Sequence, residues 1–150
     1  MTIAQALKTQ IVTNLNALVT AGVLNSVFAI DGGKNPLELE APAGYPFAIV
    51  GMPSVASDYE DQLTNRRTYR FDVLIVQDYA SLADATTSVE GTLDAVLEQF
   101  DNNFTLAGVS DATVLPTDVA VAPISTGEKT LIAFFVTIKA QALFNVTLNV

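Results

Sequence analysis

The segment from Asn65 to Val76 constrains the fold most, because its side chains alternate with the two-residue period of a β-strand. Odd-numbered residues from Arg67 to Ile75 fall on one face, and even-numbered residues from Thr68 to Val76 fall on the other. The segment is charged where it starts and apolar on both faces where it ends. It therefore predicts a strand that begins at an exposed edge or interface and runs into a core.

The size and composition of the chain indicate one domain, residues 1–150, that is large enough to bury a core. Half of the residues are apolar, and only 15% are charged, which is below the usual quarter. So much apolar material indicates that part of it lies at contacts between subunits. The alternative is a tightly packed monomer with a surface rich in Ala and Thr.

The acidic balance of the chain limits the functions that it can serve. A net charge of −9 argues against a nucleic-acid-binding groove but agrees with a surface that DNA passes without adsorbing. Histidine and cysteine are absent from the sequence, so we expect no imidazole base, no thiolate nucleophile and no conventional zinc site. We therefore expect no cofactor and no enzymatic activity. We also expect no membrane contact, since the apolar stretch 131–138 is too short for a membrane helix and no signal peptide is evident.

Hydrophobic spacing predicts an α+β domain with two amphipathic helices packed on a mixed, mostly antiparallel sheet of about five strands, in the order α-β-β-β-α-β-β. The predicted helices cover residues 3–21 and 81–100. The predicted strands cover residues 23–30, 45–52, 66–77, 114–122 and 129–141. The polar segment 54–65 is predicted to be a projecting loop.

Each predicted helix carries an apolar stripe. The first also has capping residues at its ends, and the second has a glycine in its interior. Thr2 and Gln5 form a capping box before the first helix, and Gly22 ends it. Gly91 interrupts the second helix, where glycine costs about 1 kcal/mol relative to alanine, and we predict that it relieves close packing. The two stripes are Ile3, Leu7, Ile11, Leu15 and Leu18, and Leu82, Val89, Leu93, Val96, Leu97 and Phe100.

Residues 142–150 form a possible extended arm at the end of the chain. Its apolar residues Phe144, Val146, Leu148 and Val150 alternate with polar ones. With the preceding strand, the arm gives roughly twenty extended residues, against the usual five or six. Either a bulge near 140–143 bends the arm back over its own sheet, or the arm adds a strand to a neighbouring subunit.

Two groups of opposite charge are candidates for contacts between subunits. An acidic ridge on the second helix falls within an arc of about 80°. This ridge is a solvated face, the lining of a channel, or the partner of a neighbour's arginines. Its members are Glu90, Asp94, Glu98 and Asp101, and the arginines are Arg66, Arg67 and Arg70.

A further carboxylate group, Asp58, Glu60 and Asp61, lies in the predicted loop. A pair of carboxylates can catalyse hydrolysis when an apolar pocket raises the pKa of one member. A polar loop offers no such pocket, so we favour a role in contacts for these residues. They also lack the spacing and central glycine of a calcium loop.

The ordered features resemble the tail terminator, or tail-completion, proteins of tailed bacteriophages. The resemblance rests on an amphipathic first helix, the segment Tyr45-Pro46-Phe47-Ala48-Ile49-Val50, an acidic loop, and Asn65-Arg66-Arg67-Thr68-Tyr69-Arg70-Phe71-Asp72-Val73, followed by a second helix and two late strands. As an order of elements it covers most of the chain, and motif-like detail is confined to residues 45–76.

The resemblance implies a structural virion protein that assembles as a ring, commonly a hexamer, at the head-proximal end of the tail tube. Such a ring ends tube polymerisation and joins the tail to the head connector, with genomic DNA passing through an acidic lumen without specific binding. The implied location is the neck or tail of the virion, after assembly in the bacterial cytoplasm. By analogy, the segment 54–65 would meet the tube or a neighbouring subunit.

Two other functions agree with the same residues. One is a related virion part, either a head–tail connector or a tube subunit. The other is a small cytosolic ligand-binding or carboxylate-based enzymatic domain, which would need a pocket of converging polar side chains.

Overall fold

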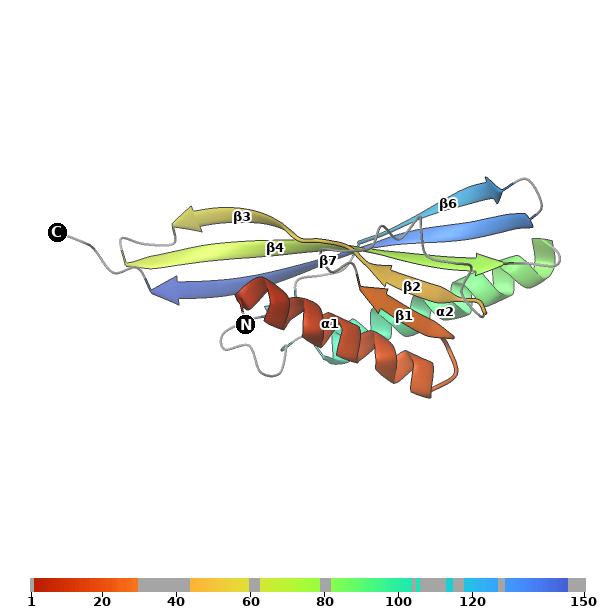
Figure 1. Cartoon of the computed structure of the whole chain (residues 1–150), viewed down its shortest axis with the longest axis horizontal. Helices are drawn as coiled ribbons and strands as arrows, with labels where there is room; N and C mark the ends of the chain where they lie inside the picture. Colours follow the sequence, from red (N-terminus) through yellow and green to blue (C-terminus); the bar gives the residue numbers. More distant parts are fainter. Residues whose placement is uncertain are drawn as a thin grey trace.

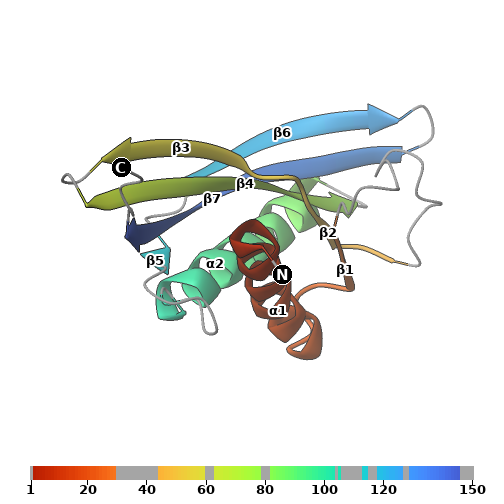
Figure 2. The same ribbon diagram turned by 60° about the vertical axis from the view of Figure 1, so that its left-hand side comes forward.

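The computed structural model describes residues 2–29, 44–59, 63–78, 82–103, 105, 113–114, 118–126 and 129–145. Within these residues a seven-stranded mixed sheet carries two helices on one of its faces (Figures 1 and 2). The elements are α1 (Ile3–Thr20), β1 (Ser26–Ala29), β2 (Phe47–Val50), β3 (Ser54–Tyr59), β4 (Thr64–Asp78), α2 (Leu82–Asn102), β5 (Thr113–Val114), β6 (Asp118–Thr126) and β7 (Lys129–Asn145).

A long antiparallel pair, β4 with β7, forms the spine of the sheet. The two strands pair without interruption from Thr64 opposite Asn145 to Asp78 opposite Leu131. On the free side of β4, β3 pairs with its first half and β2 with its second half, and β1 adds to β2 in the one parallel pairing among the described strands. On the free side of β7 lie β6 and the two-residue β5. The predicted α+β class and the mostly antiparallel sheet are confirmed.

The core lies between the sheet and the two helices. The odd-numbered side chains Tyr69, Phe71, Val73 and Ile75 of β4, which the alternation placed on one face, are buried there. Their neighbours on β7 are even-numbered, because antiparallel partners share a face: Phe134, Val136, Ile138 and Ala140 are also buried. The opposite face of the sheet, which we call the outer face, carries no helix in the described part of the chain (Figures 1 and 2).

The first helix follows its sequence signals. The Thr2 backbone N–H donates to Gln5 Oε1 at 2.8 Å, and the Gln5 N–H donates to the Thr2 hydroxyl at 3.2 Å, which completes the predicted capping box. Gly22 has φ of 80°, so the left-handed turn that ends the helix falls on the residue that adopts it most readily. Leu7, Ile11, Leu15 and Leu18 are buried against the sheet and α2, and neither described helix is both long and apolar enough to cross a membrane.

The second helix is fixed to the spine by a polar cluster that the sequence did not reveal. Gln77 on β4 and Thr92 on α2 are both buried, with 5% and 6% exposure. The Gln77 Nε2 donates to the Ser88 hydroxyl, and the Thr92 hydroxyl lies 3.4 Å from Gln77 Oε1 and 3.0 Å from the Ser88 carbonyl oxygen. Because buried polar groups need partners, these contacts satisfy Gln77 and Thr92 and link α2 to β4 at this position. Of the predicted stripe, Val89, Val96 and Phe100 are buried.

Two predictions about the sheet were wrong, and one of the two alternatives for the end of the chain lacks its bulge. The segment 54–59 is not a loop but the edge strand β3, paired with Asn65–Arg70 of β4. The single strand predicted at 114–122 is two strands, β5 and β6, so the described sheet has seven strands rather than about five. The bulge considered at 140–143 is absent, because pairing between β4 and β7 continues through those positions.

The prediction that Gly91 relieves close packing was also wrong. A Cβ placed at Gly91 would meet no atom within 4 Å. We therefore expect Gly91→Ala to raise the free energy of unfolding by about 0.5–1 kcal/mol, since alanine loses less backbone entropy in a helix. Urea unfolding followed by circular dichroism measures this change. Gly22→Ala is the control and is expected to destabilise, because Gly22 has positive φ; a destabilised Gly91→Ala would contradict the prediction.

Candidate assembly surface

The end of the spine that carries β3 projects beyond the helices (Figure 1). We call this part the blade: β3 with residues 64–70 of β4 and 139–145 of β7. All six residues of β3 are exposed. Along β4, residues 64–68 are half-buried and Arg70 is exposed, whereas most side chains from Phe71 to Gln77 are buried, which agrees with the predicted strand that runs from a charged start into a core.

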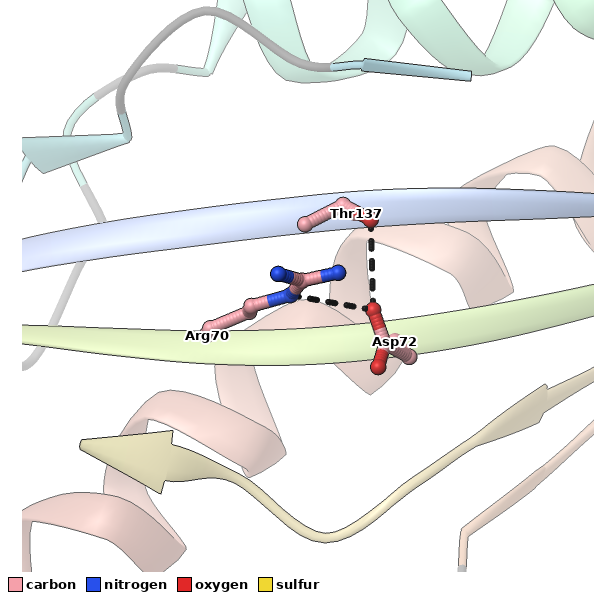
Figure 3. Close-up of polar contacts among 3 residues, drawn as sticks. All are labelled: Arg70, Asp72 and Thr137. Atoms are coloured by element: carbon pink, nitrogen blue, oxygen red, sulfur yellow. Dashed lines mark hydrogen bonds and ion pairs between the residues drawn. The ribbon is translucent and has the colours of Figure 1, made fainter. Parts of the chain in front are cut away.

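On the outer face of the blade, two of the predicted arginines have partners in their own chain. An Arg66 Nη nitrogen lies 3.5 Å from an Asp58 carboxylate oxygen, directly across the β3–β4 pairing. Arg70 Nε lies 3.4 Å from Asp72 Oδ1, and the Thr137 hydroxyl donates to the same oxygen at 3.2 Å from β7 (Figure 3). Since these groups are largely exposed, the pairs orient the arginines more than they stabilise the fold.

The third arginine lies on the opposite, helix-facing side. Arg67 Cζ is 4.5 Å from the centre of the Phe144 ring, a cation–π contact between β4 and β7. Phe144 is half-buried and packs against the core cluster. The predicted interface residue Phe144 therefore belongs to the body of its own subunit, and Arg67 covers it at the end of the core.

The acidic ridge is exposed along α2. Glu90, Asp94, Glu98 and Asp101 all face solvent, and none of the ion pairs between described residues involves them. The helix lies on one side of the sheet, whereas Arg66 and Arg70 project from the outer face on the other side. The ridge and these two arginines cannot meet within one chain, so any contact between them would join two subunits.

Four predicted site residues, Glu60, Asp61, Val146 and Leu148, lie outside the described residues. A different group was not evident from the sequence: the exposed apolar side chains in and around the blade. Val55 and Tyr59 of β3 are 51% and 68% exposed. Other large exposed apolar residues near the blade are Met52, Leu63 and Leu143. The sequence indicates this group only through the i, i+4 spacing of Val55 and Tyr59. That spacing identifies one face of a strand only once the segment is known to be a strand.

Comparison with known proteins finds a likeness in fold to solved structures. No family model matches the sequence, and no curated protein sequence matches it. The structure is similar to a chain in the solved virion of a native gene transfer agent (GTA) particle, with a TM-score of 0.55 and 15% identity over 93% of this chain and 98% of that chain. A second solved chain aligns over 99% of this chain and 100% of its own at 15% identity and a TM-score of 0.44. At such identities the likeness concerns the fold.

Proposed function

We propose that this protein is a structural component of a phage-like virion, and that it forms a ring at the head-proximal end of a tail tube. The observation that carries the proposal is the shared fold, over 93% of this chain, with a chain of a gene transfer agent virion. The projecting blade with exposed apolar side chains supports it, because a monomer gains nothing from leaving such residues in water.

In this ring the subunit has a structural role and no catalytic one. Copies of the chain bind one another through the blade, one rim meets the tube protein, and the other meets the head–tail connector. The acidic ridge on α2 lines the lumen, where its carboxylates repel the phosphates of the passing genome. The ring assembles in the bacterial cytoplasm and is then part of the virion neck.

The test is assembly of the purified protein, alone and with the tube protein of the same virion. Six chains of 15.9 kDa would give a particle of about 95 kDa by mass photometry. Electron microscopy is expected to show single rings, and added rings are expected to shorten growing tubes. Long tubes of this chain alone would indicate a tube subunit instead. A monomer that neither binds tubes nor occurs in virions would overturn the proposal.

The same material tests the placement of the acidic ridge. Because the chain has no cysteine, Asp94→Cys introduces a single thiol. In the assembled ring, a lumen thiol is expected to react with a small maleimide but not with a bulky polymer-linked one, whereas an interface thiol reacts with neither. The control is Asp78→Cys, at an exposed residue of β4, which is expected to react with both reagents. Equal labelling of Asp94→Cys by both reagents would place the ridge outside the ring.

A further inference from the structure

The free edge of β3 is the least protected strand edge in the described sheet. An open edge exposes unpaired N–H and C=O groups, and proteins usually blunt it with proline, charge or short length. β6 contains Pro123, while β1 and β5 have four and two residues. β3 has six residues, no proline, and one charged side chain, Asp58, which is already paired with Arg66.

This edge also carries exposed apolar side chains on one face. Val55 pairs with Tyr69 and Tyr59 with Asn65, so both project toward the helix-facing side of the sheet. At that position no described element covers them, and they stay 51% and 68% exposed. An unblunted, apolar edge is a template for another strand.

We infer that β3 accepts residues 146–150 of a neighbouring copy as an added strand. This inference rests on the proposed ring and names the contact that closes it. The segment reads Val-Thr-Leu-Asn-Val, with no charged side chain. In an added strand Val146, Leu148 and Val150 fall on one face beside Val55 and Tyr59, and Thr147 and Asn149 fall on the other face beside Ala56.

The topology explains why the strand must come from another copy. β7 ends at Asn145 opposite Thr64, and β3 lies on the far side of β4. To add beyond its own β3, the chain would have to cross three strand spacings, about 14 Å. Five extended residues reach about 17 Å at most, so nearly the whole segment would be used in crossing the tip of the blade. Few residues would remain to pair along β3.

An arm that leaves one subunit and enters the side of the next is a head-to-tail contact. Such contacts do not pair a surface with itself, and they generate rings when the rotation between copies closes. The inferred exchange therefore agrees with a cyclic assembly, of which a two-fold dimer with reciprocally exchanged arms is the smallest closed form.

The experiment mixes two single-cysteine forms of the otherwise cysteine-free chain. Ala56→Cys places a thiol on β3, and Thr147→Cys places one on the arm, on the same face of the added strand. Because each form has a single thiol, a mixed disulfide joins two different chains. Mild oxidation of the assembled mixture is expected to give this heterodimer as the main product, identified by mass spectrometry. Asn149→Cys repeats the test two residues along.

The matched control is Ala120→Cys, an exposed alanine on the opposite edge strand β6. It is expected to give at least about tenfold less cross-link with Thr147→Cys, because a cross-strand disulfide needs closely spaced Cβ atoms. A chain ending at Asn145 should keep its circular dichroism spectrum and lose self-assembly.

The outcomes separate this inference from the proposed function. Rings that form and end tubes without any Ala56–Thr147 or Ala56–Asn149 cross-link, or that still form from the shortened chain, overturn the arm exchange and leave the ring intact. A preferred cross-link to Ala120→Cys overturns the choice of β3. Cross-linking in oligomers that have no affinity for tubes or virions supports the exchange and overturns the tail role.

Discussion

Phe71→Ala is expected to lower the free energy of unfolding by about 3–5 kcal/mol, the usual cost of removing a buried aromatic ring. Phe71 is fully buried at the middle of β4, where the blade ends and the covered part of the sheet begins. At Phe71, β4 pairs with β7, and the β3 and β2 pairings lie on either side of this position without reaching it. The close-packed surroundings cannot collapse cheaply into a cavity of that size. Since domains of this size are stable by only about 5–15 kcal/mol, the variant should lose a large share of its stability. Chemical denaturation followed by circular dichroism measures the change.

Phe135→Ala is the matched control for this prediction. Phe135 is also a phenylalanine on the spine, but it lies on the outer face of β7 and is 43% exposed. Phe135→Ala should lower the free energy of unfolding of the isolated chain by about 1 kcal/mol or less, since a partly exposed side chain contributes only part of the free energy of full burial. Equal costs for the two variants would contradict the placement of the core on the helix side of the sheet.

Gln77→Glu is expected to cost about 3 kcal/mol or more at pH 8, although it changes only an amide into a carboxylate of the same shape. Gln77 is 5% exposed and its amide nitrogen donates to the Ser88 hydroxyl. The new side chain would lose the amide N–H group that donates to Ser88, and it would carry a charge out of contact with water. Denaturation at several pH values measures the difference from the natural chain.

The sign of the pH dependence follows from burial. Burial raises the pKa of the introduced carboxyl in the folded chain above its unfolded value of about 4.3. The folded state then binds the proton more tightly, so the penalty is small below pH 4, grows as the pH rises through the interval between the two pKa values, and is constant above the folded one. Gln141→Glu, on the half-buried outer face of β7, is the control and should show little pH-dependent difference from the natural chain. A pH-independent penalty at position 77 would contradict this account.

The elements that bury apolar side chains were predictable from the sequence. Both helices and the strands around Phe71 and Phe134 carry a periodic pattern, because one face of each packs on the core. β3 was missed for the converse reason: all six of its residues are exposed, and the spacing of Val55 and Tyr59 alone is too weak a pattern to predict a strand. Its strand conformation comes from pairing with β4, which is a tertiary contact and is not encoded locally.

The candidate surface was predictable in its residue types but not in its arrangement. The sequence identified Arg66, Arg67 and Arg70 as unusual, and alternation already separated Arg67 from Arg70. It could not show that Asp58 stands opposite Arg66, since that pairing depends on the β3 register. Nor could it place the acidic ridge across the sheet from Arg66 and Arg70, because that depends on which face α2 covers.

The uninterrupted ladder of the spine has a consequence during protein synthesis. The paired residues that are nearest in sequence are Asp78 and Leu131, and those farthest apart in sequence are Thr64 and Asn145. During synthesis, β4 therefore cannot pair with β7 until α2, β5 and β6 have also left the ribosome. Pairings between such distant positions close late and slowly. A nascent chain interrupted before β7 would lack the partner that holds β4 in place, and incomplete copies could not present a finished blade to their neighbours.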